Sequence, residues 1–504
     1  MPDPPPSYRL SRWVFLRLLG LTYSIAFVSL ATQVTGLIGS DGILPAGAYL
    51  DRLRDTYGSE AYRLYPTLLW LSSSDLALTI LCGFGVAASV LLISGVAPTL
   101  MLVLLWSCYL SVTVGGQAFM AFQWDTLLLE TGLLACLYAP RGLRPTLAAE
   151  SAPSPMARWL IWGLLFRLMF LSGITKLASG DPTWSDLTAL TYHYETQPLP
   201  LWTGWHLHQL PGWFHQFSAA GMFVVELILP WLIFVPARFR RTRMAACAGL
   251  VFLQLLIGLT GNYGFFSLLS IALCLTLIDD RTWARVLPNR LVHRAFASGN
   301  AHTPPGRWRQ LLLTAAAIGL FVLGGLQFVR EIATDLSRSG RPTVDLSWSD
   351  TILNAVSPFR SVNGYGLFRV MTVERPEIVL EGSLDGSRWT EWDLRWKPGN
   401  VHRRPGLAAP HQPRLDWHLW FAALDPQGAG HWLSPLMTRL LEGAPAVTSL
   451  VGGAAFAEGP PRYLRLAYYD YRFTTRAERA ETGAWWHRQL IDYLTEPVSL
   501  DDIR

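Results

Sequence analysis

Long apolar runs separated by short polar connections fill the first two-thirds of the chain. A helix needs roughly 20 apolar residues to cross a bilayer. The pattern therefore predicts a polytopic α-helical membrane bundle within residues 1–335. About nine membrane-spanning helices are expected, at residues 13–34, 72–94, 97–114, 119–138, 157–177, 217–236, 245–260, 262–278 and 309–329. The seventh and eighth are short, and we expect them to form a tight hairpin that turns at residues 261–264.

Residues 341–504 instead alternate apolar and polar positions, which is typical of half-buried β-strands. Strands are predicted at 377–383 and 463–473. Asp385-Gly386 is a hairpin-turn signal, and the tryptophans after it follow a mostly two-residue period. Further expectations are helical insertions at 434–442 and 417–423 and a loop at 397–414. We predict that this part is a water-soluble, β-rich domain with a β-sandwich-like architecture.

Charge is scarce and unevenly placed. Only 15% of the 504 residues are charged and 51% are hydrophobic, whereas soluble domains carry about 25% charged residues. The net charge of +5 comes from arginines in short loops between apolar runs, which is how membrane proteins fix their orientation, so no nucleic-acid site is predicted. Arginine-rich loops at 139–158, 237–244 and 279–309 fall on the side of the N-terminus.

The opposite side receives 178–216, which has no Lys or Arg, although the loop 35–66 carries three arginines among four acids. Positive charge collects on the cytoplasmic side of a membrane. We therefore expect a cytoplasmic N-terminus and an extracytoplasmic domain at 341–504. In a bacterium, this arrangement places the helices in the inner membrane and the domain in the periplasm. In a eukaryote, it places the helices in the endoplasmic reticulum membrane.

The sequence gives no sign of a bound cofactor or metal. All five cysteines lie in apolar segments and none follows residue 341, which excludes a disulfide-stapled tail and a cysteine zinc site. Histidines 193, 206, 208 and 215 fit no zinc signature and lie among tryptophans, as interfacial residues do. Walker A, dinucleotide-binding, GxSxG and kinase motifs are absent from the sequence.

Charged residues inside a bilayer are costly and are therefore candidates for function. The predicted span at 119–138 contains Asp125 and Glu130, which are offset by about 140° on a helix and do not share a face. Gln123 and Trp124 precede them, and Arg167 lies in the next span. One interpretation is a polar cavity that opens outward. The other is helix packing, with the acids paired to Arg167 or to the backbone.

The outer loop, residues 172–216, is the most unusual connection. We take its polar and aromatic residues as candidate functional residues: Lys176, Asp181, Trp184, His193, Tyr194, Glu195 and Gln197. A lysine at the bilayer edge either acts as a base or extends its ammonium group to the lipid headgroups. The residues alone leave both roles open for Lys176.

Several long strings of residues resemble the lipase maturation factor family, across essentially the whole chain. They are FQWDTLLLE at 122–130, FRLMFLSGITKL at 166–177, SGDPTW at 179–184, YHYETQPLP at 192–200, PFRSVNGYGLF at 358–368, EGSLDG at 381–386 and APHQPRLDW at 409–417. The resemblance implies a membrane-embedded maturation factor or chaperone that helps exported lipases, lipoprotein lipase among them, to fold and assemble, and it carries over no catalytic reaction. The Ala-, Arg- and Leu-rich composition suggests a bacterial member. Its expected partners are the lipid bilayer and an exported client. Candidate contacts with the client are the tail residues Trp389, Trp392, Trp417, Trp420 and Trp432. Several of these tryptophans must instead form the core of the domain.

A shorter string, SGITKL at 172–177 followed by Trp184, is similar to a motif of vitamin K-dependent γ-carboxylase-like membrane proteins. That resemblance implies the alternative of a membrane enzyme, with Lys176 as the base acting on a quinol, lipid or peptide. Asp125 or Glu130 would then line its cavity.

Overall fold

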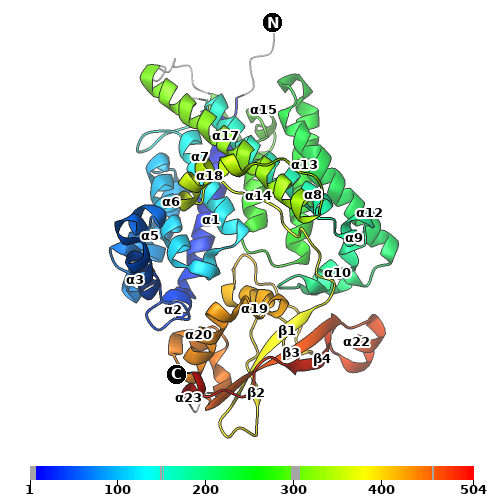
Figure 1. The fold of residues 1–504 in the computed structure, drawn as a ribbon. Helices are drawn as coiled ribbons and strands as arrows, with labels where there is room; N and C mark the ends of the chain where they lie inside the picture. The colour runs from blue at the N-terminus through cyan, green and yellow to red at the C-terminus, as the bar shows by residue number, and fades with distance from the viewer. Residues whose placement is uncertain (1–6, 148–149, 151, 297–306, 457–458, 504) are drawn as a thin grey trace.

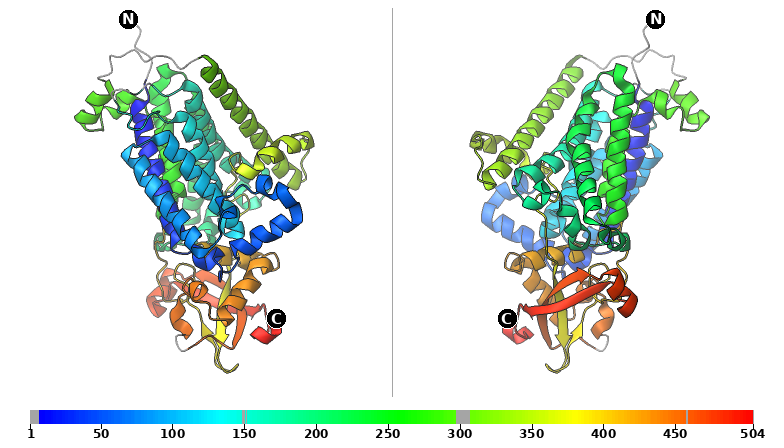
Figure 2. Two further views of the ribbon diagram at one scale, coloured as in Figure 1. Left: turned by 90° about the vertical axis from the view of Figure 1, so that its left-hand side faces the viewer. Right: turned by 90° about the vertical axis from the view of Figure 1, so that its right-hand side faces the viewer.

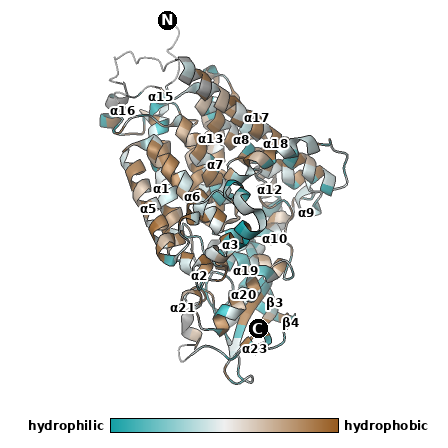
Figure 3. Cartoon of the chain, turned by 60° about the vertical axis from the view of Figure 1, so that its left-hand side comes forward, coloured by the Kyte–Doolittle hydropathy of each residue, from teal (hydrophilic) through white to brown (hydrophobic). Residues whose placement is uncertain are grey.

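The computed structural model describes the chain except for residues 1–6, 148–149, 151, 297–306, 457–458 and 504. Helices form a bundle at one end, and a smaller domain that holds the β-strands lies at the other (Figure 1). Apolar residues dominate the long bundle helices, whereas the smaller domain mixes polar and apolar positions (Figure 3). We call residues 361–503 the tail.

Among the residues that the structure describes, seven helical segments are long and apolar enough to cross a membrane. They are α1 (Arg9–Ala31), α5 (Asp75–Ser94), α6 (Pro98–Gly115), α8 (Pro155–Ala178), Gly212–Phe234, Ala237–Thr260, and Leu313–Arg338 within α17 (Arg307–Arg338). The segment 212–234 joins α12 (Gly212–Phe223) to the π-helix η4 (Val224–Ile228) and the 3-10 helix η5 (Leu229–Phe234), and α13 is Arg240–Thr260. The predicted helical membrane part is therefore confirmed.

The two remaining predicted spans form shorter helices. Residues 119–138 contain α7 (Gln123–Tyr138), of 16 residues, and 262–278 contain α14 (Phe266–Leu275), of 10 residues. The first begins late because Gln117–Met120 form a 3-10 turn, η3, and the second because the chain turns at 261–264. Both pack inside the bundle, α7 against α6 and α14 against α13. The total of nine crossings stays a prediction.

The predicted arginine-rich loops gather at the N-terminal end of the bundle. There Arg12 pairs with Glu150 at 2.8 Å, and the backbone N–H groups of Arg9 and Leu10 donate to the Asp280 carboxylate at 3.0 and 2.8 Å. The tail lies at the opposite end (Figure 2). Short helices occupy the N-terminal end, namely η6 (Ala237–Phe239), α15 (Asp280–Trp283) and α16 (Asn289–Phe296).

The end that faces the tail is built from other short helices. They are α2 (Val34–Ile38), α3 (Ala46–Tyr57), η1 (Gly58–Glu60), α4 (Ala61–Leu64), η2 (Leu68–Trp70), α9 (Pro182–Ser185), α10 (Ala189–Thr196) and α11 (Trp202–His208). After α17 the chain forms η7 (Ser347–Ser349), α18 (Asp350–Val356) and η8 (Ser357–Phe359). A stretch without helix or strand, 361–371, then runs along the bundle into the sheet.

The tail contains one antiparallel sheet in the order β2-β1-β3-β4. Its strands are β1 (Pro376–Ser383), β2 (Thr390–Glu391), β3 (Tyr463–Phe473) and β4 (Trp486–Tyr493). Pro376 pairs with Asp470 and Ser383 with Tyr463 along the whole of β1. The predictions of β1, β3 and both helical insertions are confirmed, the latter as α19 (Arg414–Leu424) and α20 (Gly430–Leu441). The remaining elements of the tail are α21 (Pro445–Thr448), η9 (Gly453–Phe456), α22 (Arg476–Thr482) and α23 (Leu500–Ile503).

Two details of the tail depart from expectation. A sandwich needs a second sheet, but the described strands form one, because α19 packs on β1 and α20 on β3. The tryptophan-rich strand near 389–396 shrinks to two residues. Its continuation is diverted because the N–H groups of Trp396 and Lys397 donate to the Asp416 carboxylate, at 3.1 and 3.0 Å, rather than to a strand.

Candidate functional site

The tail is docked into the bundle through a buried ion pair between α7 and α19. Arg414 donates from Nη1 and Nη2 to the two carboxylate oxygens of Asp125, both at 2.8 Å, and also to the carbonyl of Phe119 at 2.7 Å. The Tyr109 hydroxyl donates to the same carboxylate at 2.5 Å. Two parallel N–H···O bonds fix the geometry as well as the charge balance. Asp125 is therefore part of the joint between the tail and the membrane part.

Glu130 faces a different set of partners, as its offset from Asp125 predicts. Arg167 of α8 donates to Glu130, and the Tyr365 hydroxyl donates to it at 2.7 Å. The Asn363 N–H adds a third bond, at 3.2 Å, and the Asn363 carbonyl accepts from Arg167 at 3.1 Å. The packing interpretation of this acid, with Arg167 as its partner, agrees with the structure. The connecting segment 361–371 completes the pair.

Lys176 makes a third buried ion pair. Its ammonium group donates to the Glu226 carboxylate at 2.9 Å and to the Ser172 carbonyl at 2.7 Å, and it lies 5.3 Å from the Trp184 ring. Glu226 sits on the π-helix η4, and a Cβ at Gly173 would come within 3.0 Å of its Cβ. Glycine at 173 thus permits the close approach of η4 to α8. Lys176 is buried, so it does not extend to the headgroups.

The start of the outer loop holds the connecting segment. The Asp181 carboxylate caps α9 by accepting from Thr183 N–H at 2.8 Å, and accepts from Met371 N–H at 2.6 Å. The Trp184 indole N–H donates to the Phe368 carbonyl at 3.0 Å. Both residues therefore fix the path of the chain just before β1.

A single arginine of the tail holds the carbonyls at the middle of the outer loop. Arg375 donates to the carbonyls of Glu195 and Gln197, each at 2.5 Å, and to that of Pro198 at 3.0 Å. It is fully buried and also pairs with Glu377 at 2.7 Å, while Lys397 pairs with Glu377 at 2.7 Å. Three carbonyls aimed at one guanidinium form a rigid clamp, which a lysine cannot reproduce.

Side chains of α10 and α11 complete this contact. The Glu195 carboxylate accepts the Phe473 N–H of β3 at 2.8 Å, and burial raises its pKa. Tyr194 packs in an aromatic cluster made of Tyr194, Trp205, Tyr471, Phe473, Trp485 and Trp486. Four of these six aromatic residues belong to the tail, so the outer loop and the tail share one apolar core.

His193 and Gln197 face the turn between α13 and α14. The Tyr263 hydroxyl donates to Gln197 Oε1 at 2.9 Å and lies 3.3 Å from His193 Nε2. Burial lowers the pKa of His193 to about 4, and the nearby charge of Lys176 adds to this effect. His193 is therefore neutral at physiological pH.

The first residues of α7 contribute packing. Trp124 stacks on Phe122 with ring centroids 4.5 Å apart, and meets Trp417 of α19 edge-on at 4.7 Å. Gln123 opens the helix at its N-terminal residue. Trp417 is buried, as are Trp392, Trp420 and Trp432, whereas Trp389 is partly exposed. Four of the five tryptophans expected as client contacts therefore belong to the core and cannot touch a client.

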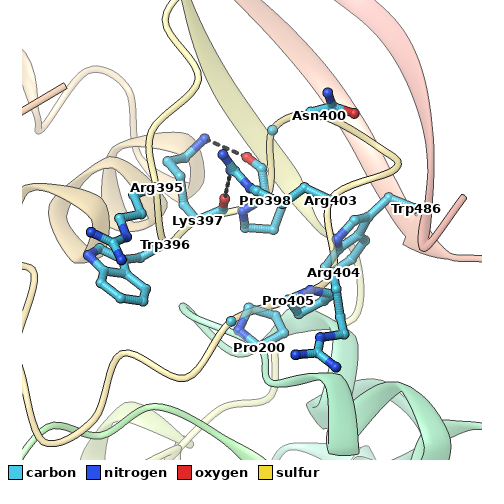
Figure 4. Close-up of a pocket in the computed structure, with 12 residues that line it drawn as sticks. Pro200, Arg395, Trp396, Lys397, Pro398, Asn400, Arg403, Arg404, Pro405 and Trp486 are labelled. Atoms are coloured by element: carbon cyan, nitrogen blue, oxygen red, sulfur yellow. Dashed lines mark hydrogen bonds between the residues drawn. The ribbon is translucent and has the colours of Figure 1, made fainter. Parts of the chain in front are cut away.

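An arginine-lined hollow lies beside this joint, between Pro200 and the loop 395–406 (Figure 4). Arg403 is bound to the Lys397 carbonyl at 2.9 Å, while the Arg395 and Arg404 side chains stand on opposite sides of the hollow. Its volume of ≈ 10 Å³ is about that of one water molecule. Within the described residues, no group of three or more His, Cys, Asp or Glu side chains could hold a metal ion.

These contacts define a class of protein: a helical membrane bundle with a second domain, which holds the sheet, docked at one end. The family model described as "Lipase maturation factor transmembrane domain" matches residues 10–285, and "Lipase maturation factor C-terminal domain" matches 361–495. The chain belongs to the lipase maturation factor family.

Named relatives match along nearly the whole chain. Lipase maturation factor 2 of Homo sapiens is 37% identical, over 98% of this chain and 83% of that protein. Lipase maturation factor 1 of Bos taurus is 33% identical, over 99% of this chain and 90% of that protein. No solved structure shows a significant match. The alternative of a γ-carboxylase-like enzyme finds no support, because the match to lipase maturation factors covers nearly the whole chain. In addition, Lys176 is paired with Glu226.

From the sequence, we selected the residues of the bundle that form this joint and missed their partners in the tail. Arg414, Arg375, Asn363 and Tyr365 had not been singled out as site residues, although three of them lie in the family-like strings at 358–368 and 409–417. One signal was available in the sequence, because a buried acid requires a cationic partner.

Proposed function

We propose that this chain helps exported lipases to fold or assemble, working from within the membrane as a maturation factor rather than as a catalyst. The family and the names of its relatives support this function. The observation that carries it is the docking of the tail. Asp125 and Glu130 bind residues of the tail and so hold it on the bundle, as a scaffold requires. Lys176 instead pairs with Glu226 inside the bundle.

We further propose the orientation and location of the chain. Residues 1–335 form the membrane part and 341–504 an extracytoplasmic domain, in the inner membrane of a bacterium or, in a eukaryote, the endoplasmic reticulum membrane. Support comes from the arginine-rich loops at the end of the bundle opposite the tail. In this orientation an exported client meets the tail as it leaves the membrane.

Strand β4 is the proposed contact surface for the client. It is the last strand in the sheet order, so one of its edges is free among the described strands. Most of its residues are exposed, including Leu490 and Ile491, whose exposed fractions are 39% and 56%. Exposed apolar side chains beside an open strand edge suit contact with an incompletely folded chain.

Removing the gene from its host, and measuring lipase activity per molecule of exported lipase, tests this function. Re-expression of the wild-type chain should restore the activity, whereas a Leu490→Lys/Ile491→Lys variant should restore little of it. Leu384→Lys, at an exposed tail residue outside β4, is the matched control and should restore it fully. Unchanged lipase activity per molecule after removal of the gene would refute the proposal.

A further inference from the structure

An apolar crevice opens between helix α17 and the rest of the bundle. Its volume is ≈ 260 Å³. Helix α17 packs mainly on α8, and the crevice lies between these two helices and η5. Most of its lining is aromatic or aliphatic, from residues that include Leu160, Phe166, Trp231, Leu320 and Phe328. The ion pair of Arg167 with Glu130 forms its polar wall.

Exposed aromatic side chains at the crevice indicate that it opens sideways. The lining residues Trp231 and Phe321 have exposed fractions of 56% and 63%. Both belong to segments long and apolar enough to cross the membrane, 212–234 and 313–338. Side chains exposed at that depth face hydrocarbon rather than water. The crevice is therefore continuous with the interior of the bilayer.

The chemistry of the lining selects one occupant. Glycines at 163 and 325 leave open space, because a Cβ at either would meet nothing within 4 Å. Arg167 is committed to Glu130 and to the Asn363 carbonyl, which leaves the polar wall balanced in charge. A flexible hydrocarbon chain fits an apolar, laterally open space of this kind, whereas a polar peptide would lose its hydrogen bonds there.

We propose that the crevice between α8 and α17 is a binding site for one acyl chain of a membrane lipid, whose headgroup stays at the membrane surface. The site lies away from β4 and does not depend on the proposed contact with a client. Gly324 shapes it, because a Cβ there would come within 3.1 Å of Arg167. Residue 324 thus lets α17 approach the ion pair while the crevice stays open beside it.

The test uses the full chain reconstituted in vesicles that contain a phosphatidylethanolamine with a photoreactive diazirine near the end of one acyl chain. After illumination, peptide mapping should find adducts concentrated on residues 160–167 and 320–328. Gly163→Leu places its Cβ in open space and its side chain in the crevice. It should lower labelling of these peptides at least about tenfold, since it displaces roughly two chain methylenes. Gly325→Leu, on the opposite helix, should act in the same way.

Gly319→Leu is the matched control, because it also projects into open space from α17 but lies outside the lining. It should leave the labelling unchanged. Labelling of α5 measures non-specific contact with lipid, and its exposed residues Ile80 and Phe84 should be labelled equally in all variants. Labelling of 160–167 no stronger than that of α5, or unaffected by both filling variants, would overturn the proposal.

Discussion

Arg414 of the tail and Asp125 of the bundle, 289 residues apart in the chain, form a bidentate ion pair with both N–H···O distances at 2.8 Å. Both side chains are buried, with exposed fractions of 1% for Arg414 and 0% for Asp125. Removing one partner of such a pair leaves a buried charge without compensation, which costs more than the pair contributes when intact. The joint between the two parts of the molecule therefore depends on both residues together.

Arg414→Met should lower the free energy of unfolding by about 3–5 kcal/mol, because Asp125 is left charged and buried. Asp125→Asn in the same chain should recover much of this loss, since the amide oxygen still accepts from Tyr109. Thermal unfolding of the detergent-solubilised protein measures both. Arg54→Leu breaks the exposed pair with Asp51 and should change stability by less than about 1 kcal/mol. A double variant no more stable than Arg414→Met would contradict this account.

Lys176 and Glu226 should behave as a structural pair. Lys176→Met alone is expected to destabilise the bundle, because the Glu226 carboxylate loses its buried partner at 2.9 Å. Lys176→Met combined with Glu226→Gln should restore both the thermal stability and lipase maturation in the host. Restored stability with complete loss of lipase maturation would instead assign a chemical role to Lys176.

Arg375→Lys should loosen the outer loop. An ammonium group cannot bond the three carbonyls of Glu195, Gln197 and Pro198 in the planar arrangement that the guanidinium provides. Amide hydrogen exchange in the tail-facing helices α10 and α11 should rise by at least about tenfold, which corresponds to roughly 1.4 kcal/mol of local opening. Arg488→Lys, at the partly exposed pair with Glu391, should leave exchange in these helices unchanged.

Acidification should destabilise the protein through His193. Its pKa is lowered from 6.5 to about 4 in the folded chain, so the unfolded chain takes up the proton first as the pH falls. The stabilising contribution is complete above pH 6.5 and is lost as the pH falls to about 4, with a total of at most about 3 kcal/mol. The difference in unfolding temperature between wild type and His193→Gln should shrink over this range. A constant difference would exclude this role.

Local patterns predicted the elements but not the joints between them. The alternation in 377–383 and 463–473 identified β1 and β3, since each has a buried face. Strand β4 went unpredicted, because seven of its eight residues escape full burial and leave no alternation to read. The tryptophans near 392 predicted a longer strand than β2. The competing bond, which the Trp396 N–H donates to the Asp416 carboxylate, joins residues 20 positions apart and leaves no local signal.

The candidate residues were selected because they are unusual in the sequence, and their contacts came only from the structure. The 140° offset of Asp125 from Glu130 indicated separate partners, and Arg167 was named as one of them. Arg414 could not be found in this way, because the pairing of charges across 289 residues leaves no periodic signal. The tail partners of the outer-loop residues Glu195 and Asp181 could not be predicted either, because the tail is distant from them in the chain.

Contact between the tail and a lipase client is measured most directly by site-specific photo-crosslinking in the host. A photoreactive amino acid in place of Leu490 on β4 should capture newly exported lipase before it becomes active. The same substitution at Phe84, on the exposed face of the membrane helix α5, should capture none. Normal lipase maturation in cells where position 490 never yields a lipase adduct would contradict the role proposed for the tail.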